Sequence, residues 1–212
     1  MLADVRRLAA ELSDAYPKID VLCNNAGGMI PTRQSTVDGF ERTIQSNHLA
    51  PFLLTNLLRD RLAGGRVVNT ASDAHKDGRL DPANLDSPGS YKGMTVYGTG
   101  KQANVLFAAE AARRWPEILS TSFHPGVVRT RFGRESFLVS AFFKLVPGLL
   151  TPAHGADTML WLATAPAGEL TNGGYYYKRQ LLQPSPNAAD PALAAALWKA
   201  SEAAVGLQTP RS

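Results

Sequence analysis

The spacing of apolar residues along this chain switches between a helical period and short continuous runs. A stripe of apolar positions predicts a first helix over residues 3–15. Short segments between the helical stretches predict strands at residues 19–23, 66–70, 119–123 and 175–178. Helical spacing predicts the remaining segments as helices, at residues 35–62, 97–114, 153–163 and 191–204. Ser35, with Asp38 three residues later, is expected to cap the start of the long second helix.

The predicted strands lack the polar alternation of a sheet that is exposed on one face. Strands of this kind that alternate with helices are typical of a parallel sheet covered on both faces. The expected fold class is therefore α/β with a doubly wound parallel sheet. Cys23 falls in the first of these strands, where a buried, inert thiol is the expectation.

Composition narrows the class of protein. At 212 residues and 44% apolar content, the chain fits one domain, residues 1–212. The positive residues behind the net charge of +4 are scattered along the chain. They form no basic face with interleaved aromatic residues, so nucleic acid is not expected as a partner. The single cysteine excludes an internal disulfide, and the four histidines lack metal-ligand spacing, so no metal site is expected. The N-terminus lacks the pattern of a secretory signal, and no apolar run is long enough to span a bilayer, so a cytoplasmic location is the expectation.

Tyr97 and Lys101 are the most informative residues. Free tyrosine titrates near pH ~10, too high for ready acid–base cycling at neutral pH. A lysine four residues later on a helix lies on the same face, one turn away. Its positive charge is expected to lower the pKa of Tyr97, as general acid–base catalysis near pH 7 requires. The same spacing also occurs on solvated helix faces, so the pair alone leaves that alternative open.

Other polar motifs follow the predicted strands. Asn24-Asn25-Ala26-Gly27 follows the first strand, Ser72 the second and Pro125-Gly126 the third. In parallel α/β sheets the ligand site lies beyond the carboxyl ends of the strands, which is where these motifs fall. Ser72 is alternatively a residue that only caps its loop.

Asn47 interrupts an otherwise apolar helix face. Pro51, four residues later, lacks the N–H group that would bond to the Asn47 carbonyl, which predicts a kink and a free carbonyl. The alternative is a polar helix residue bonded to a neighbour.

These motifs, in this order and spacing, resemble the short-chain dehydrogenase/reductase superfamily from about residue 2 to residue 207. The retinol-dehydrogenase-like and protochlorophyllide-reductase-like branches are most similar, through Asn47-His48-Leu49, Ala74-His75, residues 101–107 and His124-Pro125-Gly126. The resemblance implies a Rossmann-like fold and hydride transfer with a nicotinamide cofactor, NADP(H) rather than NAD(H).

The resemblance also implies roles for particular residues. Tyr97 would be the general acid/base, Ser72 would orient the substrate oxygen, and Asn47 would hold a water that relays protons to Lys101. Lys101 would also bond the ribose of the cofactor. The implied catalytic residues are Asn47, Ser72, Tyr97 and Lys101, and the implied cofactor-binding residues are Asn24, Asn25, Ala26, Gly27, Tyr97, Lys101, Pro125, Gly126, Val128 and Thr130. Gly100 departs from the family, where serine is usual, and His75 and His124 are expected to be structural neighbours of the site.

The family carries a glycine-rich phosphate-binding turn ahead of the Asn-Asn-Ala-Gly motif, and no segment here matches it. The resemblance therefore implies an N-terminally truncated fold that lacks most of its first βαβαβ half. We expect such a chain to bind NAD(P)H at least about a hundredfold more weakly than an extended protein. Residues 19–23 are expected to form an exposed sheet edge that favours association.

The apolar segment at about residues 131–152 matches the substrate lid of the family and suggests an apolar carbonyl or alcohol as substrate. The alternative is a helix pair that packs on the core or against a second subunit in a homodimer. The function expected is an oxidoreductase acting on an apolar carbonyl/alcohol pair. Two alternatives are a catalytically silent homologue that binds no dinucleotide, and a sugar-nucleotide epimerase or dehydratase, which would need a larger C-terminal domain.

Overall fold

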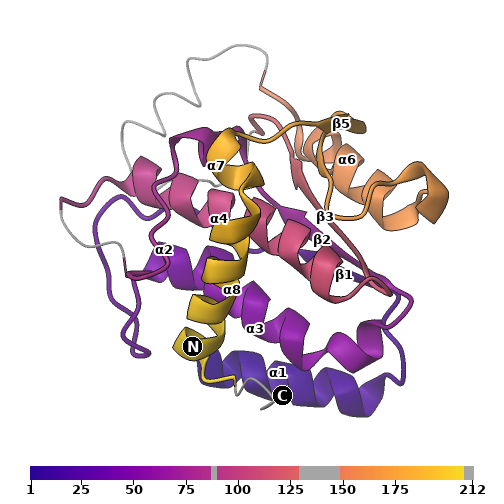
Figure 1. Cartoon of the computed structure of the whole chain (residues 1–212), viewed down its shortest axis with the longest axis horizontal. Helices are drawn as coiled ribbons and strands as arrows, with labels where there is room; N and C mark the ends of the chain where they lie inside the picture. Colours follow the sequence, from indigo (N-terminus) through magenta and orange to yellow (C-terminus); the bar gives the residue numbers. More distant parts are fainter. Residues whose placement is uncertain (87–89, 129–148, 208–212) are drawn as a thin grey trace.

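The computed structural model describes residues 1–86, 90–128 and 149–207. Within these ranges a five-stranded sheet has the order β1-β2-β3-β4-β5 (Figure 1). The first four strands are parallel and the fifth is antiparallel to its neighbour. The strands are β1 (Val21–Asn24), β2 (Arg66–Thr70), β3 (Leu119–His124), β4 (Tyr175–Tyr177) and β5 (Gln180–Leu182). The α/β fold with a mainly parallel sheet is confirmed.

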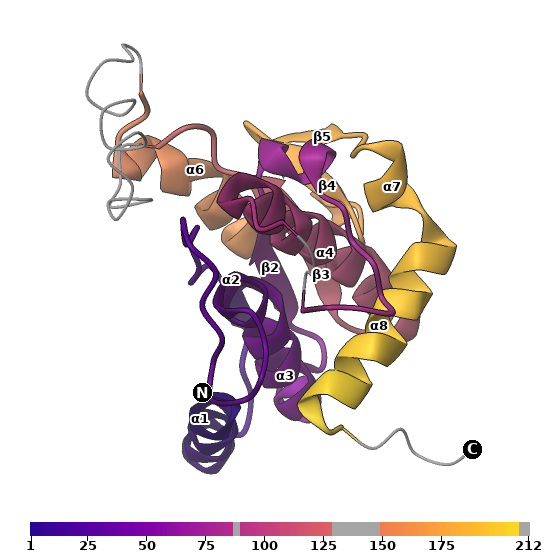
Figure 2. The same ribbon diagram turned by 90° about the vertical axis from the view of Figure 1, so that its left-hand side faces the viewer.

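Helices pack on both faces of this sheet (Figure 2). On one face the central helix α4 lies against β2 and β3, α8 packs on α4, and α1 packs on α3. On the other face α6 packs against β1, β2 and β3. The helices are α1 (Leu2–Ala15), α2 (Arg42–Ile44), α3 (Ala50–Leu57), α4 (Gly93–Arg114), α6 (Pro152–Thr164), α7 (Pro186–Ala189) and α8 (Pro191–Val205). No helix in the described ranges combines the length and apolar character needed to cross a bilayer.

An aromatic cluster fixes the helices of the first face. The Phe52 ring of α3 lies 5.0 Å from Trp198 of α8 and 5.3 Å from Phe107 of α4, measured between ring centroids. Trp115 packs edge-on against Trp198 at 4.9 Å. Aromatic side chains bury large apolar areas and gain about 0.5–1.5 kcal/mol more per pair from their ring geometry. This cluster therefore determines where α4, which carries Tyr97 and Lys101, lies.

The opposite face has a smaller apolar core, made by Val68, Phe123 and Tyr176 with Leu162 of α6. Cys23 pairs with Val68 in the parallel register, so its side chain points to the same face. The thiol is nevertheless exposed, and the expectation of a buried cysteine is wrong. The reason is that β1 is an edge strand that α6 covers only in part.

The segment predicted as one helix over residues 35–62 begins later than expected. Ser35 forms an isolated antiparallel bridge with Glu41, and the helix starts at Arg42. The carboxylate of Glu41 accepts a hydrogen bond of 2.9 Å from the Ile44 N–H group, so Glu41 is the cap instead of Ser35. The same segment ends in a short 3-10 turn, Arg59–Leu62.

A π-helical turn, Gln45–Leu49, joins α2 to α3. It ends two residues before Pro51, which has no N–H group for the Asn47 carbonyl. The sequence predicts a kink and a free carbonyl here from Pro51, and the structure has a π turn at this place, a feature that is frequent at functional sites.

The sequence pattern did not predict β5. Lys178 and Arg179 connect β4 to β5 with φ angles of +50° and +61°. Two-residue hairpin turns with positive φ usually carry Asn-Gly or Asp-Gly, so Lys-Arg gives no turn signal. Arg179 forms an exposed ion pair with Asp157, which links this turn to helix α6.

We predict an acid-sensitive contribution to stability from His48, which is 1% exposed beside Phe52 and Phe107. Burial lowers the pKa of His48 from 6.5 to about 4. Since the pKa in the folded chain lies below that in the unfolded chain, the stabilisation is complete above pH 6.5 and is lost as pH falls towards 4. At about 1.4 kcal/mol per pKa unit, the loss reaches about 3 kcal/mol.

Urea unfolding at pH 7 and at pH 4.5 measures this contribution. His48→Gln removes the titrating group and keeps an amide that can bond to Ser201, so it should reduce the difference in stability between the two pH values. His75 and His124 are unchanged in that variant and serve as the internal control. An identical pH dependence in His48→Gln would contradict the assignment.

Candidate active site

The parallel strands end at one edge of the sheet and bring the sequence motifs together there. Asn24 is the last residue of β1, β2 ends two residues before Ser72, and β3 ends at His124, just before Pro125. Asn24 pairs with Asn69 and Thr70 pairs with Phe123, so these ends lie in register. The loops that carry the predicted site residues therefore lie side by side.

Tyr97 and Ser72 are in direct contact. Tyr97 lies in the second turn of α4, and its half-buried side chain hydrogen-bonds to the side chain of Ser72. The Ser72 hydroxyl oxygen also accepts a hydrogen bond of 3.2 Å from the Ala74 N–H group. Ser72 therefore caps its 3-10 turn, Asp73–Asp77, and contacts Tyr97 at the same time.

Lys101 is buried beneath this contact, with 3% of its surface exposed. Its ammonium nitrogen donates a hydrogen bond of 2.9 Å to the Thr70 carbonyl and lies 5.5 Å from the centroid of the Tyr97 ring. Burial lowers the pKa of Lys101 to about 8. An ammonium group has three N–H donors, and among the described residues Thr70 is its one hydrogen-bond acceptor. Lys101 therefore keeps donors for a ligand.

The pKa of Tyr97 shifts in the direction opposite to the expectation. Burial of the ring raises this pKa, and the hydrogen bond with Ser72 lowers it by less. Lys101 gives its hydrogen bond to the Thr70 carbonyl, and its charge lies near the ring face. Desolvation of the phenolate therefore outweighs the hydrogen bond with Ser72.

Asn47 lies between the loop after β1 and helix α4, with 1% of its surface exposed. Its amide nitrogen donates to the Gly28 carbonyl at 2.7 Å and to the Thr43 carbonyl at 2.8 Å. Its side-chain oxygen is buried and has no hydrogen-bond partner among the described residues. A buried acceptor of this kind normally binds an ordered water.

Three glycines permit the close approach of these groups. A Cβ atom on Gly27 would collide with the side-chain oxygen of Asn47, and one on Gly100 would lie 3.2 Å from the Asn47 Cβ. A Cβ atom on Gly98 would lie 2.5 Å from the Ala74 carbonyl oxygen. The two glycines of α4 therefore have a packing reason: they let the helix touch both Asn47 and the Ser72 turn.

The side chains of the Asn-Asn-Ala-Gly loop mainly hold the loop itself. Asn24 donates to the Thr55 hydroxyl at 3.0 Å and to the Asn69 side-chain oxygen at 2.9 Å, so it points into the protein. The Asn25 side-chain oxygen accepts a 2.9 Å hydrogen bond from the Thr70 hydroxyl. Ala26 and Gly27, with φ of +152° at Gly27, leave the backbone open on the outer side.

The loop after β3 is shaped by Gly126, with φ of +85°. Val128 forms an isolated parallel bridge with Leu150. The predicted cofactor contact Thr130 and residues 131–148 of the expected lid lie outside the described residues.

Two further residues belong to this cluster: Asn104, which the sequence did not reveal, and His124, which was expected to be a structural neighbour of the site. Asn104 donates to the Thr70 carbonyl at 3.1 Å, the same acceptor that Lys101 uses. Its position three residues after Lys101 on the same helix was the available signal. His124 accepts hydrogen bonds from the Asp73 and Gly126 N–H groups at 3.2 and 3.4 Å, so it joins two loops at the sheet edge.

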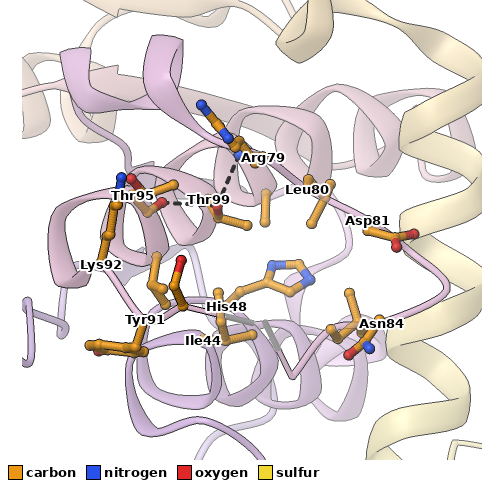
Figure 3. A pocket seen from close by; sticks show the side chains of 14 residues that line it. Ile44, His48, Arg79, Leu80, Asp81, Asn84, Tyr91, Lys92, Thr95 and Thr99 are labelled. Carbon is orange, nitrogen blue, oxygen red and sulfur yellow. Dashed lines mark hydrogen bonds between the residues drawn. The ribbon is translucent and has the colours of Figure 1, made fainter. Parts of the chain in front are cut away.

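The described cavities lie beside this cluster and do not contain Tyr97, Ser72 or Lys101. Figure 3 shows a cavity of about 490 Å³ on another face of α4, lined by Thr95, Thr99 and His48. A second cavity, of about 520 Å³, lies at Ala74 and Met94, one turn before Tyr97. The polar cluster at the sheet edge is therefore distinct from the cavity of Figure 3.

Comparisons with known proteins agree with this geometry. Residues 2–138 match the model of the short chain dehydrogenase family. A Streptomyces sp. (strain C5) protein assigned as a daunorubicin C-13 ketoreductase, DnrU, is 55% identical over 206 residues, 97% of this chain and 71% of that protein. Retinol dehydrogenase 14 of Homo sapiens is 38% identical over 216 residues, 97% of this chain and 64% of that protein. The chain therefore spans about two thirds of the length of these relatives.

Solved structures show the same fold. An uncharacterized protein from Mycobacterium paratuberculosis has a TM-score of 0.78 and 34% identity, covering 100% of this chain and 74% of that one. The angucycline C-6 ketoreductase LanV with bound NADP has a TM-score of 0.57 and 24% identity, covering 81% of this chain and 66% of that one. At 24% identity, the likeness to LanV supports the fold alone.

We predict that Gly98→Ala destabilises the chain by about 1–3 kcal/mol, because its Cβ would collide with the Ala74 carbonyl. The gain of about 1 kcal/mol in helix propensity would reduce the loss without reversing it. Gly168→Ala is the control, because nothing lies within 4 Å of its Cβ, and it should change stability by less than about 0.5 kcal/mol. Urea unfolding measures both, and a Gly98→Ala chain as stable as the original would refute the packing argument.

Proposed function

Because this chain belongs to the short chain dehydrogenase family, we propose that it is an oxidoreductase that acts reversibly on an apolar carbonyl/alcohol pair with NADP(H). The observation that carries the proposal is the hydrogen bond between Tyr97 and Ser72, with the buried Lys101 ammonium beneath it. Two hydroxyl groups that can meet one substrate oxygen, beside a fixed positive charge, suit proton transfer to that oxygen.

In this proposal Tyr97 donates a proton to the carbonyl oxygen in reduction and accepts it in oxidation. Its raised pKa keeps the phenol protonated at neutral pH, which suits the reductive direction. Ser72 orients the substrate oxygen through its hydroxyl group. The nicotinamide cofactor, when bound, supplies or accepts the hydride.

The residues of the sheet edge fit such a cofactor. Lys101 keeps N–H donors that suit the hydroxyl groups of a ribose. The Asn24–Gly27 loop and the Pro125–Val128 loop follow β1 and β3 at the carboxyl edge of the sheet, where their backbone can meet a ligand. The buried side-chain oxygen of Asn47 suits a water that passes protons towards Lys101. Some solved structures of the same fold hold NADP or NADPH, so the fold accommodates such a cofactor.

An apolar ketone is the substrate class that we propose. The names of the relatives refer to a ketone of daunorubicin and to retinol. Two exposed apolar side chains lie on the elements of the site: Met94, one turn before Tyr97, is 52% exposed, and Val127, next to Gly126, is 50% exposed. An apolar substrate would cover both.

A second candidate is a chain that keeps the fold without binding the dinucleotide. In the described residues no strand leads through a glycine-rich turn directly into a helix, which is the arrangement that holds a pyrophosphate. This observation favours the second candidate. A measurement of NADPH and NADH binding separates the active oxidoreductase from the chain that binds no dinucleotide.

We predict that Tyr97→Phe lowers the rate of NADPH-dependent ketone reduction by at least about a hundredfold while cofactor affinity changes little, because only the proton donor is lost. Lys101→Ala should lower both rate and affinity. Tyr16→Phe, on a tyrosine that is 54% exposed after α1, is the matched control and should leave both unchanged. Near-normal rates in Tyr97→Phe on every ketone tested would show that Tyr97 is not the proton donor.

We also predict that NADPH binds more tightly than NADH in calorimetric titrations of the unaltered chain. Absence of heat with both cofactors, together with a native unfolding transition, would favour the chain that binds no dinucleotide. Tighter binding of NADH would contradict the cofactor assignment and leave the reaction class intact.

A further inference from the structure

His75 lies directly beneath the Ser72 turn, with 1% of its surface exposed. Its Nδ1 atom lies 2.7 Å from the Ser72 carbonyl oxygen. Its Nε2 atom accepts a hydrogen bond of 3.1 Å from the N–H group of Ser185, which is 110 residues away in the sequence. Both ring nitrogens are therefore used inside the protein.

These two contacts determine the protonation state of the ring. The Ser185 N–H group can only donate, so Nε2 must be the acceptor. In a neutral imidazole the other nitrogen then carries the proton, so Nδ1–H donates to the Ser72 carbonyl. Only the neutral Nδ1–H tautomer satisfies both partners.

The ring is also held from the side. Tyr175 of β4 packs edge-on against His75, with ring centroids 5.0 Å apart and planes at 66°. Ser185 is the residue before α7. His75 thus joins three separate segments: the turn after β2, strand β4 and the start of α7.

Among the described residues, few contacts besides those with His75 hold the Ser72 backbone. Its carbonyl accepts from the N–H and Nδ1–H groups of His75, and its hydroxyl is shared between the Ala74 N–H group and Tyr97. A shift of the carbonyl would turn the hydroxyl away from Tyr97.

We propose that His75 is a positioning residue for the active site: it fixes the Ser72 backbone so that the Ser72 hydroxyl meets Tyr97, and it couples this contact to the segment before α7. The catalytic part of this inference rests on the proposed function of Ser72 and Tyr97. The alternative is a core histidine whose loss only lowers stability.

Two substitutions separate the two contacts. His75→Asn places an amide N–H group near the position of Nδ1, so it can keep the bond to the Ser72 carbonyl while losing the acceptor for Ser185. His75→Gln places an amide oxygen near the position of Nε2, so it can keep Ser185 and lose the donor to Ser72. If His75 positions Ser72, the Asn variant should retain function better than the Gln variant, whatever their stabilities.

The first readout does not require turnover. In the isolated chain, ¹⁵N NMR at pH 7 should show His75 as the Nδ1–H tautomer. The absorbance titration of Tyr97, obtained by difference from Tyr97→Phe, should move to higher pH in His75→Gln, because the Ser72 hydrogen bond lowers the pKa of Tyr97. The same titration should change little in His75→Asn. The Nε2–H tautomer, or equal titrations in both variants, would overturn the proposal.

The second readout is kinetic. His75→Gln should lower kcat for ketone reduction at least about tenfold with KM nearly unchanged, and His75→Asn should restore most of kcat. Equal losses that follow the stabilities of the two variants would show a core role only. Absence of turnover in the unaltered chain would count against the proposed function, and the NMR and titration results would still decide the role of His75. If one variant does not fold, the role of His75 is decided by its tautomer in the unaltered chain and by the Tyr97 titration of the other variant.

Discussion

The buried ammonium group of Lys101 is the constraint on which the site depends. A charge with 3% exposure is costly unless it is hydrogen-bonded, and the Thr70 carbonyl at the end of β2 accepts that bond at 2.9 Å. Helix α4 must therefore lie close to the strand ends. Gly98 and Gly100 permit this approach, because a Cβ atom at either position would meet the Ala74 carbonyl or Asn47. The aromatic cluster around Phe52 and Trp198 fixes the same helix from its other side.

The π turn, Gln45–Leu49, also lies where α4 approaches the strand ends. It places Asn47 against both the loop after β1 and α4, with its amide nitrogen bonded to two carbonyls and its oxygen unpaired. A buried acceptor without a partner lowers stability, and such groups persist where a ligand or water uses them. Within the described ranges, the remaining N–H donors of Lys101 and the side-chain oxygen of Asn47 have no protein partner, so they can bind a ligand or water.

The first four strands could be predicted because short strand-like segments alternate with helical patterns, and the motifs after β1, β2 and β3 could be placed together because parallel strands end at one edge. The contact of Ser72 with Tyr97 was implied by the family resemblance. Prediction from the sequence failed where tertiary contacts override local pattern. The helix start moved from Ser35 to Arg42 because Glu41 caps it, and β5 was missed because Lys178-Arg179 carries no turn signal. Cys23 and the pKa of Tyr97 depend on how much of each side chain other elements cover, which periodicity does not reveal.

The burial that holds Lys101 also determines the electrostatics of the site. Removal of water lowers the pKa of Lys101 and raises that of Tyr97, so both groups are driven towards their neutral forms. The pair then differs from a simple ion pair, in which each charge would stabilise the other. At neutral pH Tyr97 is therefore a protonated phenol that can donate its proton, and Lys101, with a pKa of about 8, lies close to the pH at which it exchanges its own proton. The hydrogen bond with Ser72 lowers the pKa of Tyr97 and so offsets part of the desolvation, whereas burial itself brings the pKa of Lys101 down to about 8.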